Sequence, residues 1–170
     1  MKTNVSRFGI LGLLLIATVA AILTFAYAEW YAMIRVAILV PLMVSVFLPG
    51  LPGRVLRTLF GFLGSAGFGF FVCLWSVYPL GHAFPGSGGT LALGLEIALL
   101  AVFTVLFVLR ELRVLRSPVP VRIAGIFVLG LVGAFLVYHG FLQPAGIAVE
   151  FVSYLPFYAA LVVMGGNAQK

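Results

Sequence analysis

The sequence contains very little charge. Of its 170 residues only 8% are charged, Asp is absent, and 64% are apolar. Few soluble domains present a wettable surface with so few charged side chains. Several apolar stretches also exceed the roughly 20 residues that a helix needs to cross a bilayer. The composition therefore excludes an ordinary soluble domain and predicts an all-α, polytopic transmembrane helix bundle.

Cysteine and histidine are almost absent. Cys73 is the single cysteine, so the chain can form no internal disulfide and no cysteine-cluster metal site. His82 and His139 are the two histidines, and neither has a second histidine or a carboxylate at metal-binding helical spacing. We predict no metal and no cofactor. A haem held by both histidines near the outer face remains an alternative.

Catalytic signatures are also missing. The sequence contains no nucleophile elbow, no phosphate-binding lysine loop and no dinucleotide-binding glycine fingerprint in a strand–helix context. We therefore do not expect an enzyme. An intramembrane enzyme that acts on a lipid or quinone, with Glu and His as acid and base, stays open as an alternative.

The net charge of +6 comes from Lys and Arg in alternate gaps between apolar runs. Two precede the first run, two lie between the second and third, four between the fourth and fifth, and one follows the last, while Arg35 lies inside a run. Lys and Arg are retained on the cytoplasmic side during membrane insertion. No basic face interleaved with aromatic residues accompanies them, so we expect no nucleic-acid partner.

This alternation predicts a single transmembrane domain, residues 1–170, in the cell (plasma) membrane. Its partner is the lipid bilayer, and six helices would place the N- and C-termini in the cytoplasm. The expected spans cover approximately residues 8–28, 30–48, 59–80, 91–109, 123–142 and 145–164.

The first span has an alternative interpretation. Ala26-Tyr27-Ala28 matches the A-x-A pattern of a signal-peptide cleavage site after a basic start. The apolar stretch is about 21 residues, longer than the usual 7–15 residues of a signal core. We therefore favour an uncleaved first helix, and cleavage would leave five spans.

Small residues recur at spacing four in the third span, at Gly61, Ser65 and Gly69. Such spacing lets helix backbones approach closely in lipid. We expect these residues to pack helices within the bundle, with docking onto a partner membrane subunit as the alternative. The basic segment Arg110–Arg116 would attract anionic headgroups if the fourth helix continues past the membrane. We expect it to fix the topology, with contact with a soluble partner subunit as the alternative.

Four ionisable residues fall at one depth near the outer face. Arg35, Glu96 and Glu150 each lie five residues inside the outer start of a span, and His139 lies three residues from the outer end of another. At 1.5 Å per residue the first three lie about 7–8 Å below the boundary. Intramembrane charges seldom face lipid and often mark a function.

Counting charge in this layer suggests a binding site. Arg35 can neutralise one carboxylate through a forked contact, which leaves the other carboxyl to accept a proton, a cation or an amine. Tyr154 lies one turn beyond Glu150 and would complete its hydrogen bonds. An Arg–Glu pair that only fixes helix packing, or side chains that reach the headgroups, is the structural alternative.

These residues lead to a functional hypothesis. We expect a small-solute or proton-coupled transport component with an outward-facing polar pocket formed by Arg35, Glu96, Glu150, His139 and Tyr154. A structural or accessory subunit of a larger membrane complex is the alternative.

Overall fold

The computed structural model describes residues 2–24, 29–142 and 152–167. Within them the chain forms helices and no strands, as the sequence predicts. The helices are α1 (Lys2–Leu23), α2 (Glu29–Phe47), α3 (Gly50–Ala83), α4 (Ser87–Glu111), α5 (Val119–Leu142) and α7 (Tyr154–Gly166).

Three of these helices are long and apolar enough to cross a membrane. They are α2 over Trp30–Phe47, α3 and α4. The apolar parts of α1 (Arg7–Leu23), α5 (Val119–Phe135) and α7 are shorter. The prediction of membrane-type helices is therefore confirmed for three of the six expected spans. The total of six spans is not confirmed.

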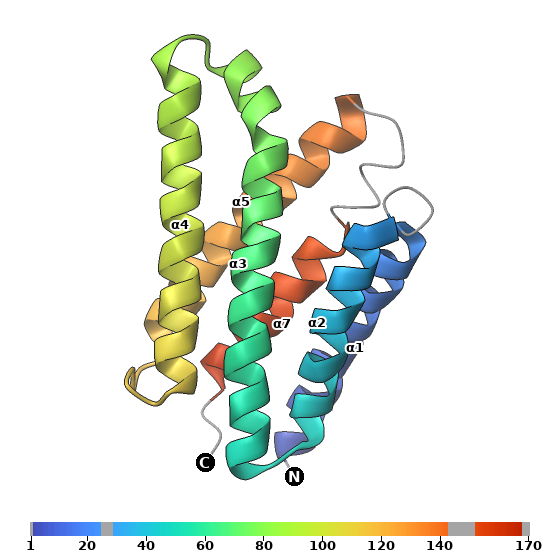
Figure 1. Ribbon diagram of the computed structural model, residues 1–170. Coiled ribbons are helices and arrows are strands. Elements are labelled where there is room, and N and C mark those ends of the chain that lie inside the picture. Colours follow the sequence, from blue (N-terminus) through green and yellow to red (C-terminus); the bar gives the residue numbers. More distant parts are fainter. Residues whose placement is uncertain (1, 25–28, 143–151, 168–170) are drawn as a thin grey trace.

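The helices surround α7, which lies in the middle of the bundle (Figure 1). Helix α7 packs against α1, α3, α4 and α5, and the outer helices pack in sequence order, α1 with α2 through to α4 with α5. Most side chains of α7 are buried, among them the aromatic rings of Tyr154, Phe157 and Tyr158. Helix α7 is therefore the core of the described part of the fold.

Helix α3 is longer than the expected span of residues 59–80, and it contains two prolines, Pro52 and Pro79. Pro52 lies in the first turn, where the backbone N–H groups have no partner within the helix. Two positions in this first turn require glycine. Gly50 has a φ of +72°, and a Cβ on Gly53 would lie 2.0 Å from the carbonyl oxygen of Leu48. Helix α3 also continues through Pro79 to Ala83. The gaps expected at residues 49–58 and 81–90 are therefore reduced to residues 48–49 and 84–86.

The small residues of α3 pack against helices of the same chain. A Cβ on Gly61 would lie 2.3 Å from the ring of Phe107 on α4, and one on Gly69 would lie 3.3 Å from the hydroxyl of Tyr158 on α7. Ser65 Oγ and Thr104 Oγ1 are 2.6 Å apart, and the Tyr158 hydroxyl donates to the carbonyl of Ser65 at 3.1 Å. Close approach and short polar contacts thus join α3 to α4 and α7.

Arginines join the helices at one end of the bundle, where α2, α4 and α7 end and α3 and α5 begin. We call this the arginine end. It also holds both chain termini (Figure 1). Arg57 donates to Glu111 on α4 at 3.2 Å and to the carbonyl of Ser45 on α2 at 3.0 Å. Helix ends carry unsatisfied carbonyls and partial negative charge, so guanidinium groups suit them.

The last turn of α7 receives two further arginines at this end. Arg110 Nε donates to the carbonyl of Gly165 at 3.1 Å, and Arg122 Nη2 donates to that of Gly166 at 2.8 Å. The basic residues that the sequence places in alternate gaps therefore also satisfy helix C-termini. Only part of the segment Arg110–Arg116 is used in this way, because Arg113 and Arg116 are exposed.

Candidate functional site

Arg35 is buried where α2, α3 and the start of α7 meet. Its side chain is 1% exposed. Nη1 donates to the Ser153 hydroxyl at 3.1 Å, and Nη2 donates to the Tyr154 hydroxyl at 2.8 Å. The guanidinium carbon lies 4.8 Å from the ring centre of Tyr154 and 5.7 Å from that of Phe68. Forked hydrogen bonds and cation–π contacts hold the charge in place.

Ser153 and Tyr154 are therefore hydrogen-bond partners of Arg35. The contact of Tyr154 with Glu150 that the sequence suggested stays a prediction. Glu150 lies outside the described residues, as does the side chain of His139. The arrangement fixes α7 to α2 through side chains 118 and 119 residues apart in the sequence.

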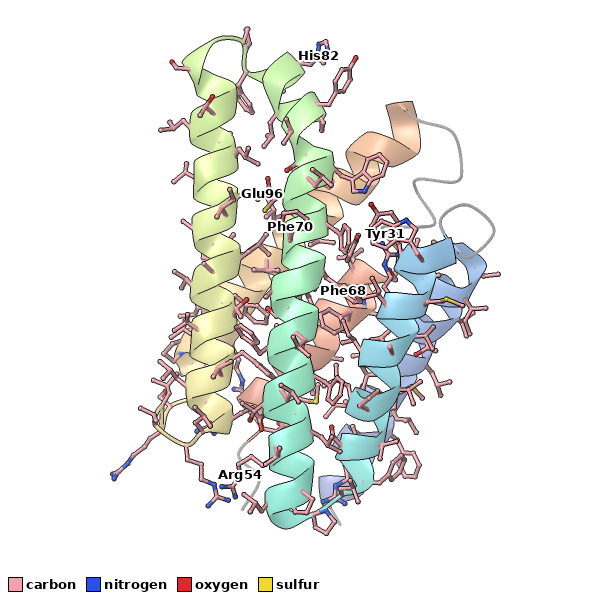
Figure 2. The ribbon with its side chains drawn as sticks, viewed as in Figure 1. Tyr31, Arg54, Phe68, Phe70, His82 and Glu96 are labelled. Atoms are coloured by element: carbon pink, nitrogen blue, oxygen red, sulfur yellow. The ribbon has the colours of Figure 1, made fainter. Side chains whose placement is uncertain are left out.

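Glu96 is buried at a different interface, between α4 and α3. Its side chain is 3% exposed. Figure 2 shows it between these two helices, whereas Phe68, which faces Arg35, points from α3 toward α2 and α7. Among the described residues no Lys, Arg or His forms an ion pair with Glu96. The sequence left open which carboxylate Arg35 neutralises, and among the described contacts it is not that of Glu96. Position along a span sets depth, but the direction a side chain faces depends on how its helix packs.

The one described hydrogen-bond contact of Glu96 is compatible with a protonated carboxyl. Ser76 Oγ lies 2.5 Å from Glu96 Oε2 and 2.7 Å from the carbonyl oxygen of Cys73. A serine hydroxyl has one proton to donate. If it donates to the Cys73 carbonyl, the contact with Glu96 is a hydrogen bond only when the carboxyl carries a proton and donates it to Ser76.

The second oxygen of the carboxyl supports the same protonation state. Glu96 Oε1 is buried and has no hydrogen-bond partner. A carboxylate would leave negative charge on this oxygen without a donor in an apolar interior, which is costly. A neutral carboxyl leaves only a weak carbonyl acceptor there. The site therefore accommodates the protonated, neutral form of Glu96 readily. The ionised carboxylate would require a cation close by.

An open groove lies next to this carboxyl, between α3 and α4. It has a volume of about 400 Å³ and an almost entirely apolar lining. Cys73 belongs to the lining, and Glu96 is close enough to interact with it electrostatically. We call it the α3–α4 groove, and its walls include Gly69, Cys73 and Val77 from α3 and Leu93, Ile97 and Leu100 from α4.

Sequence reasoning missed both Ser76 and the α3–α4 groove. A signal was present, because Ser65, Gly69, Cys73 and Ser76 continue one stripe of small residues along α3. The part of the chain that the structure describes holds no cluster of three His, Cys, Asp or Glu side chains able to bind a metal. Comparison with protein-family models, curated proteins and solved structures finds no match to the chain.

Proposed function

We propose that the chain is a six-span protein of the cell membrane with both termini in the cytoplasm. Three membrane-type helices support this proposal, as does the location of both termini at the arginine end (Figure 1). Arg54 lies at that end and His82 at the opposite one (Figure 2). Retention of Arg on the cytoplasmic side then gives the orientation.

In this proposed orientation the protein is a proton-coupled transport component for small solutes, and Glu96 is its proton-binding group. The observation that carries the proposal is the Ser76–Glu96 contact, which is a complete hydrogen bond when Glu96 is protonated. Ionisable groups inside a span are costly and commonly belong to ion or proton pathways. Arg35 contributes by fixing α7 against α2 and is a positioning residue.

The chemistry is an exchange at one carboxyl. With a proton bound, Glu96 is neutral and its burial beside α3 costs little. When the proton leaves, the carboxylate needs a compensating cation, because no cationic side chain among the described residues pairs with it. Occupancy by a proton and occupancy by a cationic solute are therefore mutually exclusive, which is the coupling that an exchanger requires.

Proteoliposomes that contain a pH-sensitive dye test the proposal. Under an imposed pH gradient, addition of small cationic and amine solutes is expected to produce a solute-dependent proton flux with the wild type. Glu96→Gln, which cannot release a proton, should abolish it. Ser45→Ala is the matched control, because the Ser45 hydroxyl bonds only the carbonyl of Leu42. Equal flux in Glu96→Gln and wild type would overturn the proposal.

A further inference from the structure

The α3–α4 groove opens toward the outside of the bundle, on the surface of two helices long enough to cross a membrane. Residues along it are exposed to a large extent, with Phe70 at 63%, Leu74 at 53% and Ile97 at 51%. If α3 and α4 span the bilayer, the exposed apolar surface faces acyl chains. A molecule would then enter the groove from the lipid rather than from water.

Several residues that line the groove are small. Ser65, Ala66, Gly69 and Ala101 all contribute to the lining, so the space between the two helices is not filled by the protein. Its volume of about 400 Å³ lies toward the lower part of the range of small-ligand sites, roughly 300–1,000 Å³. The space suits one compact apolar molecule.

The chemistry at one wall specifies the charge of that molecule. Cys73 lines the groove, Ser76 lies one turn further along α3, and the hydroxyl of Ser76 contacts the Glu96 carboxyl. That carboxyl has a buried oxygen without a hydrogen-bond partner. A carboxylate near an apolar groove is complementary to a cation with an apolar body, and a neutral molecule would gain nothing from it.

We infer that the α3–α4 groove binds a lipophilic monovalent cation from the bilayer, whose charge the Glu96 carboxylate neutralises as its proton is released. The inference rests on the proposed function and names its substrate class. Glu96 does not line the groove, so its side chain must reorient to reach the ligand. The proton balance is one cation bound for one proton released.

Other titratable groups near Glu96 are Cys73 on α3 and Tyr158 on α7. Neither carries positive charge, so neither can replace the cation. Tyr158 already donates its hydroxyl proton to the carbonyl of Ser65. Proton release on ligand binding is therefore assigned to Glu96, and substitution of this residue should remove it.

Binding of tetraphenylphosphonium to the purified protein in lipid nanodiscs tests the inference. This probe is a permanent lipophilic cation, and triphenylphosphine oxide is a neutral aromatic counterpart. Wild-type protein is expected to bind the cation saturably, with about one proton released per cation, and to discriminate against the neutral compound. Glu96→Gln should weaken cation binding at least tenfold and release no proton.

A matched pair of variants tests the location. Ala101 lines the α3–α4 groove, and Ala37 lines a second apolar groove between α1 and α2. Both alanines are exposed, so replacement by Phe should be tolerated at either position. Ala101→Phe should weaken binding of the cation at least tenfold, and Ala37→Phe should leave it unchanged.

The outcomes separate this inference from the proposed function. Cation binding that is insensitive to Glu96→Gln, or equal affinity for the neutral compound, overturns the inference, even if solute-dependent proton flux through Glu96 persists with other solutes. Binding that depends on Glu96 but not on Ala101 also overturns it, because the ligand then enters elsewhere. Crosslinking of Cys73 to a partner helix in native membranes would show that a protein, not a small cation, fills the groove.

Discussion

At the residue scale, Arg35 combines full burial with a forked geometry. Lysine at this position would keep the charge, but it lacks the planar fork whose two nitrogens donate to Ser153 and Tyr154 and which lies over the Tyr154 ring. We expect Arg35→Lys to destabilise the protein by about 1.5–3 kcal/mol, the range for hydrogen bonds to charged groups. Unfolding in detergent micelles measures it, with the exposed Arg113→Lys as a control that should not change.

Ser76 gives a second prediction at this scale. A protonated Glu96 should show a carboxylic-acid C=O band in the infrared spectrum that Glu96→Gln removes. Ser76→Ala takes away the hydroxyl that contacts Glu96 Oε2, so the band should move to higher wavenumber. Ser45→Ala, which also removes a serine hydroxyl bonded to its own helix, should leave the band in place. A band unchanged by Ser76→Ala would contradict the proposed hydrogen bond.

The sequence identified Arg35 and Glu96 as buried charges because few other charges occur within the apolar runs. It did not identify their partners. Hydropathy and the count of residues from the end of a span give depth, and both residues are indeed buried. Which neighbour each one faces depends on the rotation of its helix and on the order of helices around α7, and neither is encoded in a local pattern.

At the scale of the elements, α3 supplies contacts to three neighbours through its small residues. A Cβ on Gly61 would lie 2.3 Å from the buried ring of Phe107, which has no free space to move into. We expect Gly61→Ala to destabilise the bundle by about 1–3 kcal/mol, as overpacking usually does. A Cβ on Gly67 of the same helix would meet no neighbouring atom within 4 Å, so Gly67→Ala should be neutral or slightly stabilising. Thermal unfolding of both variants in the same detergent compares them.

The element boundaries were only partly predictable. The expected spans left residues 49–58 and 81–90 outside the helices, yet α3 runs from Gly50 to Ala83. Proline is tolerated in a first turn, and the loss of one hydrogen bond at Pro79 does not end a helix that is held by packing on both sides. The Ala26–Ala28 cleavage pattern lies beyond the end of α1 and outside the described residues, so the uncleaved first helix stays a prediction.

At the scale of the whole molecule, the proposed orientation is directly testable by cysteine labelling. Cys73 is the only cysteine, so a Cys73→Ala background allows single cysteines to be introduced at exposed loop or helix-end positions. In intact cells a membrane-impermeant maleimide should label Ser87→Cys and not Ser117→Cys, which lies beside the arginine end. Permeabilisation should make both reactive. Labelling of Ser117→Cys in intact cells would contradict the orientation.

The arginine end has a consequence for assembly. Arg110 and Arg122 come from α4 and α5, but their carbonyl acceptors Gly165 and Gly166 belong to α7, which follows both in the chain. During synthesis the two guanidinium groups therefore exist before their partners do. Helix α7 also fills the centre of the bundle, so the helices that precede it must stay apart long enough to admit it. Assembly of the described helices should thus be completed only after α7 has left the ribosome.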